Sequence, residues 1–158
     1  MISLVTATEK NLPQVLEIFQ EAISPSWTHK ALLSEISKGD SHFIVAVDES
    51  KGCDATGFPL IVVGFAVLRQ VGDDGELLQI AVEKSSRGRG VGDLLIDSVL
   101  DYAAENAFNS VFLEVRCSNT AAVSLYKKHG FESVRIRKDY YNSPVEDALV
   151  MVKITAID

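Results

Sequence analysis

Hydrophobic and polar positions alternate at the start of the chain and then change to helical spacing. Residues 2–8 alternate and predict a short strand, because successive side chains of a strand point to opposite faces. Apolar residues recur at helical spacing over 12–23, behind a start with Pro13 in the first turn, and Ser24-Pro25-Ser26 breaks that pattern. A second, shorter helix is expected over about 28–39. The N-terminal part therefore predicts one strand followed by two helices.

The middle of the chain is rich in β-branched residues that are separated by polar turns. Residues 42–48 read as a strand, 49–58 as a polar loop, and 59–71 contain a second strand. Gly72-Asp73-Asp74-Gly75 is a strong turn signal, and a third strand follows over 76–82. Three consecutive antiparallel strands are expected here.

The longest helical pattern covers residues 91–107, and a cleanly alternating strand follows over 110–116. The order strand, helix, strand over 76–116 is a crossover, which makes its two strands parallel neighbours. The strand 110–116 has two distinct faces. Its apolar face carries Val111, Leu113 and Val115, and the opposite face carries Phe112, Glu114 and Arg116.

The C-terminal part predicts one more helix and two closing strands. Ser118-Asn119 can cap a helix that runs to about His129, and Gly130 ends it. The closing strands are expected over 131–138 and 147–154. The whole pattern predicts an α/β fold, with a mixed, mostly antiparallel central sheet and helices on both faces.

The length of the chain and its net charge limit the number of domains and the kinds of partner that we expect. The 158 residues predict a single domain over 1–158, and the net charge of −7 argues against binding to nucleic acid or to an anionic membrane. Such a charge suits a basic partner. Cys53 and Cys117 are too few for a disulfide framework and are expected as free thiols. With no leader-like start and no long apolar run, the expected location is cytoplasmic.

One segment carries candidate chemistry, Arg87-Gly88-Arg89-Gly90-Val91-Gly92, which lies between a strand and the longest helix. Its glycines let an anion approach the backbone, and two arginines and the helix N-terminus add positive charge. The spacing fits neither a P-loop nor a dinucleotide-binding fingerprint, because the Lys-Ser/Thr pair and the third glycine are missing. The segment predicts a pyrophosphate cradle, and the alternative is a flexible basic turn.

This segment resembles the acetyl-coenzyme A signature of the GCN5-related N-acetyltransferase (GNAT) superfamily, whose element order also matches nearly the whole chain. The resemblance implies the GNAT fold, acetyl-coenzyme A as cosubstrate and no metal. It also implies that the backbone of Ile80, Ala81 and Val82 pairs with the pantetheine arm, where the family separates this strand from the next. The implied cofactor-binding residues are Ile80, Ala81, Val82, Arg87, Gly88, Arg89, Gly90, Val91, Gly92 and Asn119.

Two further segments resemble the protein N-terminal acetyltransferases of that superfamily. They are residues 113–131 and the pattern Tyr140-Tyr141, Glu146-Asp147-Ala148 and Met151. The resemblance implies acetyl transfer to the N-terminal α-amine of a protein, in particular a basic ribosomal small-subunit protein that begins with alanine. The alternatives are an acetyltransferase for a lysine side chain or a small amine, and a non-catalytic acetyl-coenzyme A-binding module.

The same resemblance assigns roles in amine attack on a thioester. Glu114 is the candidate base, and the alternative is a surface glutamate paired with an arginine. Tyr126 is the candidate acid for the departing thiolate, and otherwise a core aromatic. Asn119 either bonds the coenzyme arm or only caps its helix. Tyr140 and Tyr141, expected in the loop between the last two strands, line the peptide slot or merely pack.

Some features depart from the family pattern or carry no chemistry. Trp27 is a candidate substrate contact, and a core position explains it equally well. The loop 49–58 is long, and the tail turn is Asn142-Ser143-Pro144-Val145 where relatives often have a glycine turn. The three histidines show no metal-ligand spacing. These departures concern the peptide slot rather than the coenzyme site.

Overall fold

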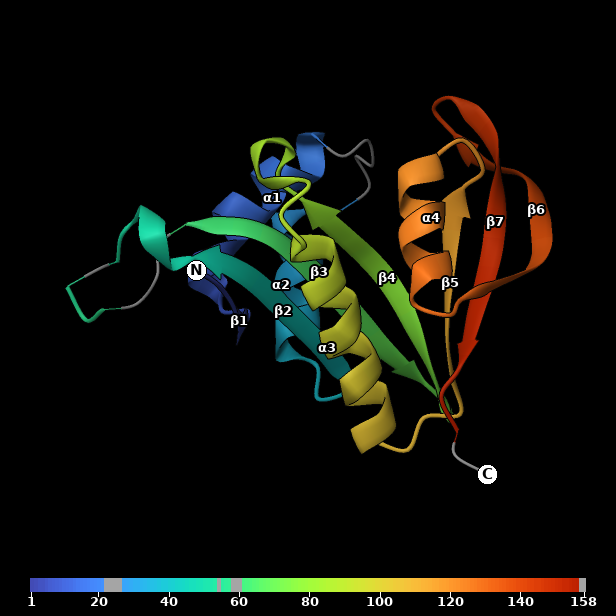
Figure 1. Ribbon diagram of the computed structural model, residues 1–158, viewed down its shortest axis with the longest axis horizontal. Helices are drawn as coiled ribbons and strands as arrows, with labels where there is room; N and C mark the ends of the chain where they lie inside the picture. Colours follow the sequence, from blue (N-terminus) through green and yellow to red (C-terminus); the bar gives the residue numbers. More distant parts are fainter. Residues whose placement is uncertain (22–26, 54, 58–60, 157–158) are drawn as a thin grey trace. The chain divides into compact units, whose positions relative to one another are not determined.

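The computed structural model describes residues 1–21, 27–53, 55–57 and 61–156 (Figure 1). The helix break expected at 24–26 lies outside these residues. Short 3-10 turns cover Glu9–Asn11 (η1), Glu49–Lys51 (η2) and Lys84–Ser86 (η3). The strands and α-helices are, in order, β1 (Ile2–Thr6), α1 (Leu12–Glu21), α2 (His29–Ser37), β2 (Ser41–Asp48), β3 (Val62–Val71), β4 (Asp74–Val82), α3 (Val91–Glu105), β5 (Ser110–Arg116), α4 (Thr120–Lys128), β6 (Glu132–Asn142) and β7 (Val145–Ile154).

The seven strands form one sheet in the order β1-β2-β3-β4-β5-β7-β6. β1 pairs with β2, β5 with β7 and β6 with β7, all antiparallel. β4 pairs with β5 in parallel, Gly75 opposite Val111 and Glu76 opposite Phe112, which confirms the predicted crossover. The expected mixed, mostly antiparallel sheet is therefore confirmed.

The described residues belong to two compact units. The first comprises residues 1–68 and 79–95, and the second comprises 69–78 and 96–158. Whether the two units fold as one domain stays a prediction. Within the described part of the chain, no helix has the length and apolar character needed to cross a membrane.

Adjacent residues of β3 show why helices cover both faces of the sheet in the first unit. The ring centres of Phe65 and of Phe19 in α1 are 5.1 Å apart, and Phe65 is fully buried. Gly64 points to the other face, because successive strand residues alternate. An atom at its Cβ position would lie 3.1 Å from Val91 Cγ1 and 3.3 Å from Leu95 Cδ1, both at the start of α3. Figure 1 shows α1 and the start of α3 on opposite sides of β3.

Gly64 is required for this close approach, and we expect Gly64→Ala to destabilise the protein. The added Cβ would also lie 3.0 Å from the backbone oxygen of Ala81 in β4, which cannot rotate away. Overpacking of this kind costs about 1–3 kcal/mol, and each kcal/mol lowers Tm by about 2–4 °C in a chain of this size. Gly39→Ala is the matched control, since a Cβ there meets no atom within 4 Å. Equal thermal unfolding curves for the two variants would contradict the assignment.

In the second unit the predicted two faces of β5 are confirmed. Residues 111, 113 and 115 are buried, and residues 112, 114 and 116 are partly exposed. α3 ends at Glu105, two residues before the predicted end at Ala107. Ala107 adopts a left-handed φ of 56°, and the N–H of Phe108 donates to Ala103 O at 2.9 Å. This is the usual closure of a helix C-terminus, made here without glycine.

Several predicted boundaries were wrong. β1 stops at Thr6, because the Thr8 N–H donates to Asn11 Oδ1 at 2.8 Å and turns the chain toward α1. The predicted loop 49–58 begins with the 3-10 turn η2. The last hairpin is longer than predicted, so Tyr140 and Tyr141 lie in β6 and not in a loop.

Candidate functional site

The predicted cradle occupies the connection between β4 and α3 in the first unit. Its start is fixed by Ser86, which is fully buried and whose hydroxyl donates to Glu83 Oε2 at 3.2 Å. Gly88 and Gly90 have φ of 77° and 80°, a region that disfavours residues with a Cβ. The glycines therefore allow the chain to turn sharply just before α3 begins at Val91.

This connection fits a bound pyrophosphate. A Cβ placed on Gly88 or on Gly90 would meet no atom within 4 Å, so the backbone there is open on its outer side. The first N–H groups of a helix have no acceptor within the helix and favour anions. Val91 is buried, while Gly92 in the first turn of α3 is partly exposed. The connection is therefore an open loop at a helix N-terminus, and its role as a pyrophosphate cradle stays a prediction.

The two arginines of the loop are both engaged with other parts of the first unit. Arg87 Nε donates to the backbone oxygen of Val82 at 3.1 Å, and Arg89 donates to Asp48 Oδ2 at 3.1 Å. Ile80, Ala81 and Val82 form the partly exposed end of β4. The pairing of their backbone with a pantetheine arm stays a prediction.

Glu114, the candidate base, lies on the polar face of β5 in the second unit. Its side chain is 19% exposed, and Arg137 of β6 donates to Oε1 at 3.3 Å. A hydrogen bond to Glu114 is also the largest cause that raises the pKa of Tyr140. The carboxylate is therefore held between a cation and a phenol, and it is still open to solvent.

An irregularity in β6 turns Tyr140 toward Glu114. The β6–β7 register moves from Arg137 opposite Ala148 to Tyr141 opposite Glu146, which leaves extra residues in β6. Within this bulge Asp139 has a left-handed φ of 53°, and its N–H donates to Asp147 Oδ1 at 2.8 Å. Bulges redirect side chains in this way and are frequent beside active sites.

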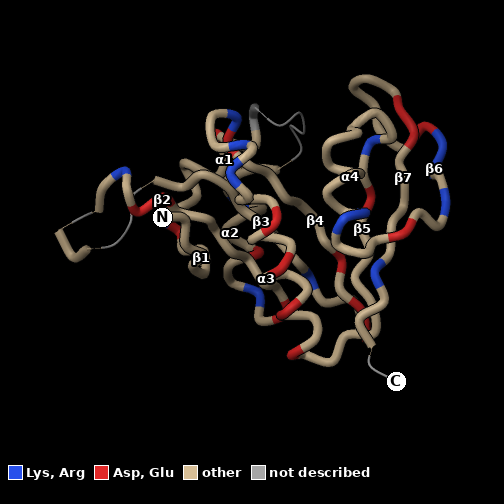
Figure 2. Tube along the Cα trace, in the orientation of Figure 1, with Lys and Arg blue, Asp and Glu red and all other residues tan. Residues whose placement is uncertain are grey.

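Arg116 and Glu146 stabilise the turn of the same hairpin through hydrogen bonds and an ion pair. Arg116 donates to Glu146 Oε1 at 3.3 Å and to the backbone oxygen of Pro144 at 3.0 Å, and its guanidinium lies 4.3 Å from the ring centre of Tyr141. Glu146 also accepts the Ser118 N–H at 2.7 Å. Hydrogen bonds from the Ser118 hydroxyl and then from its N–H lower the pKa of Glu146. The motif residues 116, 146 and 147 thus support the segment that carries Tyr140 and Tyr141. Figure 2 shows the basic residues of β6 in blue along this hairpin.

Tyr126, the candidate acid, is 6% exposed on α4, with its ring 5.8 Å from that of Phe131. Burial, and next the neighbouring Tyr141, raise the pKa of Tyr126, so its hydroxyl keeps its proton. Burial likewise raises the pKa of Tyr141 to about 12. Asn119 caps α4, its Oδ1 accepting the Ala122 N–H at 3.2 Å. This confirms its capping role, and its coenzyme contact stays a prediction.

Glu76 is a candidate residue that the sequence analysis missed. It lies opposite Phe112 in the parallel β4–β5 pair and therefore shares the face of Glu114. Burial and then the charge of Glu114 raise the pKa of Glu76, while Arg69 and Arg137 oppose this effect. The predicted parallel pairing could have placed Glu76 on this face, but its position next to the Asp-Gly turn hid it.

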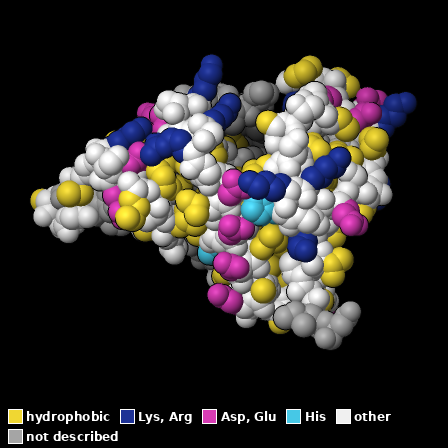
Figure 3. Space-filling model, viewed as in Figure 1, with side chains coloured by type: hydrophobic (Ala, Val, Ile, Leu, Met, Phe, Trp, Pro, Cys, Tyr) yellow, Lys and Arg dark blue, Asp and Glu magenta, His cyan; other side chains and the backbone are white. Residues whose placement is uncertain are grey.

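Trp27 is partly exposed in the first unit, and its ring stacks on Phe19 at 6.1 Å. This contact accounts for the tryptophan as a packing residue, and its substrate role stays a prediction. Both Cys53 and Cys117 are free and exposed. On the face drawn in Figure 3, acidic side chains (magenta) and basic side chains (dark blue) are interspersed.

Known proteins resemble this chain in sequence and in fold. The profile of the acetyltransferase (GNAT) family matches residues 12–131. The [ribosomal protein bS18]-alanine N-acetyltransferase of Salmonella typhimurium is 29% identical over 95% of this chain and 94% of its own length. The crystal structure of the ribosomal-protein-S18-alanine N-acetyltransferase from Escherichia coli has 26% identity and a TM-score of 0.84, covering 100% of this chain and 96% of that one. Ard1 from Thermoplasma volcanium has 27% identity and a TM-score of 0.84, covering 99% of each chain.

Proposed function

The chain belongs to the acetyltransferase (GNAT) family, and from this premise we propose that it acetylates the N-terminal α-amine of a protein. The observation that carries the proposal is the arrangement in the second unit. A partly exposed Glu114 is bonded to Arg137 and Tyr140 beside the supported Tyr140–Tyr141 hairpin. Relatives named for alanine N-acetylation, at 29% identity, support the same class of acceptor.

An α-amine suits a site of this kind. Its ordinary pKa is about 8, so roughly a quarter is neutral and nucleophilic near pH 7.5, against about 0.1% of a lysine side chain. Only modest help from a base is then needed. Glu114 takes the proton of the attacking amine, directly or through one water. Arg137 holds the Glu114 carboxylate in place during this step.

The protonated Tyr126 hydroxyl supplies a proton to the departing thiolate. Because burial raises its pKa, this hydroxyl stays protonated throughout the neutral range. Tyr140 and Tyr141 present hydroxyls and ring edges from β6, where an acceptor peptide would lie along the hairpin. The ring centres of these two tyrosines are 5.1 Å apart.

The first unit provides the coenzyme site. Acetyl-coenzyme A supplies the acetyl group as an activated thioester. The backbone of the Arg87–Gly92 loop and the N-terminus of α3 would hold its pyrophosphate, because both are open and electropositive. Arg87 fixes the loop to the end of β4 through Val82.

Gly90→Ala should weaken acetyl-coenzyme A binding by about tenfold, the equivalent of about 1.4 kcal/mol. The reason is conformational: an added Cβ is strained at a φ of 80°, so the loop must change shape. Gly57→Ala is the matched control, because Gly57 has a φ of 84° and equally open surroundings in the same unit. Titration calorimetry on both variants checks the prediction. Equal affinity for coenzyme in the two variants would remove the loop as the coenzyme site.

The finer proposal is that the acceptor is a ribosomal small-subunit protein beginning with alanine. The relatives named for bS18 and the net charge of −7, which attracts a basic tail, support it. The test is incubation of unacetylated bS18 with the enzyme and acetyl-coenzyme A, followed by peptide mapping. One acetyl group on the N-terminal alanine is expected. Acetylation only at internal lysines would contradict both the acceptor and the α-amine assignment.

A further inference from the structure

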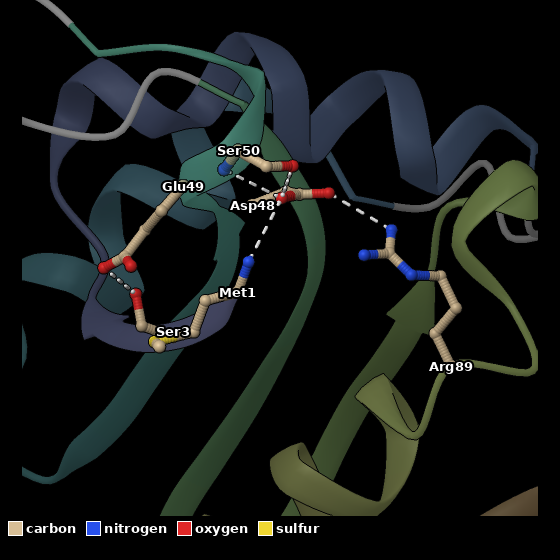
Figure 4. A network of polar contacts seen from close by, with 6 residues as sticks. All are labelled: Met1, Ser3, Asp48, Glu49, Ser50 and Arg89. Carbon is tan, nitrogen blue, oxygen red and sulfur yellow. Dashed lines mark hydrogen bonds and ion pairs between the residues drawn. The ribbon is translucent and has the colours of Figure 1, made fainter.

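The buried carboxylate of Asp48, at the end of β2, bonds Arg89 of the Arg87–Gly92 loop, which we call the coenzyme loop (Figure 4). Asp48 is 1% exposed, and its Oδ2 accepts from Arg89 at 3.1 Å. Its Oδ1 accepts from the Ser50 hydroxyl at 2.6 Å and from the Ser50 N–H at 3.1 Å. The amino group of Met1 lies 4.0 Å from the same oxygen. Asp48 is thus a fixed, fully satisfied anchor point.

Arg89 needs such an anchor because of its neighbours in the chain. It lies between Gly88 and Gly90, and both have positive φ. Glycine restricts the backbone less than any other residue, so a loop of this kind is costly to order. A charge-assisted bond to a buried carboxylate is among the strong polar contacts in proteins. It can hold Arg89, and with it the flanking glycines, in one conformation.

The same pairing changes what Arg89 offers to a ligand. Its charge is already balanced by a carboxylate 3.1 Å away, and that carboxylate repels a phosphate. Hydrogen bonds from Ser50 and the bond and charge of Arg89 keep the pKa of Asp48 at about 2. The carboxylate is therefore ionised at every pH at which the enzyme would work. A phosphate next to Arg89 would always meet this negative charge.

We infer that Asp48 and Arg89 are positioning residues for the coenzyme: their ion pair holds the Arg87–Gly92 loop in its anion-receiving shape, and Arg89 is not a direct phosphate ligand. This inference rests on the proposed coenzyme site. It differs from the expectation drawn from the sequence, which gave Arg89 a direct role.

The two roles of Arg89 predict opposite effects of removing the charge of Asp48. Asp48→Asn keeps the shape and the Oδ1 acceptor for Ser50 and removes only the anion. If the pair positions the loop, Asp48→Asn and Arg89→Gln each weaken binding of coenzyme A by about tenfold. The double variant is then no worse than either single variant, because both remove one shared interaction. Arg89→Lys, which keeps a donor and the charge, recovers part of the affinity.

The experiment is calorimetric titration with coenzyme A, together with steady-state kinetics. For Asp48→Asn we expect a raised KM for acetyl-coenzyme A, with kcat and the KM for the acceptor peptide within about twofold of wild type. Glu35→Gln is the matched control, because Glu35 is 2% exposed and accepts from Lys38 at 3.0 Å and from Ser41, away from the loop. It should keep the coenzyme affinity of wild type.

Each other outcome overturns a specific statement. Weaker binding by Arg89→Gln with unchanged or tighter binding by Asp48→Asn makes Arg89 a direct ligand. Unchanged affinity in both variants removes the pair from the coenzyme site. If wild type itself binds no coenzyme A, the proposed function fails and not this inference alone. Should Asp48→Asn not fold, Ser50→Ala tests the same anchor, and wild-type affinity in that variant counts against the inference.

Discussion

Glu114→Gln should lower kcat for an α-amine peptide by about 10²–10⁴-fold, the range in which general base catalysis contributes. The amide keeps the size of the side chain but cannot accept a proton. The pH–rate profile of this variant should differ from that of wild type, because the group that takes the proton of the amine has been removed. The KM for acetyl-coenzyme A should stay near that of wild type, because the coenzyme loop is unchanged.

Glu132→Gln is the control for this variant, since Glu132 is an exposed glutamate at the start of β6 in the same unit. It should retain wild-type turnover, which separates loss of the base from loss of net charge. A Glu114→Gln enzyme with an unaltered pH profile would mean that another group is the base. Glu76 would then be the next residue to test, because it shares the face of Glu114.

Tyr126→Phe should lower kcat by about 10²-fold with little change in coenzyme affinity. The substitution removes one hydroxyl, while the ring contact with Phe131 at 5.8 Å remains. The pKa of Tyr126 is raised, so the folded protein holds this proton more firmly than the unfolded chain. The contribution of the protonated Tyr126 to the free energy of unfolding is fully present below about pH 10, the ordinary pKa of tyrosine. It is lost only as the pH rises through the higher pKa of the folded protein. An alkaline fall in wild-type rate near pH 8–9 would therefore come from another group.

Tyr102→Phe provides the matched comparison for Tyr126→Phe. Tyr102 lies on α3 in the same unit, with its ring edge-on to Phe108 at 6.0 Å. It should leave kcat unchanged while losing the same atom. Equal turnover in the two variants would reduce Tyr126 to a core aromatic.

Local sequence rules predicted the elements that carry the site. The alternation of apolar and polar residues placed Glu114 on the polar face of β5. As expected, Asn119 caps the start of α4, and Gly130, with a φ of 89°, follows its end. These features depend on residues close together in the chain. Their physical causes, the two-residue period of a strand and the unpaired groups of helix ends, act without tertiary context.

The features that the sequence did not reveal depend on contacts between distant residues. The bulge that turns Tyr140 needs Asp139 at a left-handed φ, held by Asp147 of the next strand. The partner of Arg89 lies 41 residues away at Asp48. Gly64 matters only because β4 and α3 approach it. None of these follows from propensity or spacing, since each is set when strands pair and helices pack.

The account is tested most directly by acetyl transfer to two peptides, read by mass spectrometry. One peptide has a free N-terminal alanine followed by arginine and no lysine, and the other has a blocked N-terminus and one internal lysine. We expect acetylation of the first peptide alone, and its loss with Glu114→Gln. Acetylation of the second alone would assign the enzyme to side-chain amines. If neither peptide is acetylated while the protein still binds coenzyme A, the α-amine assignment is contradicted.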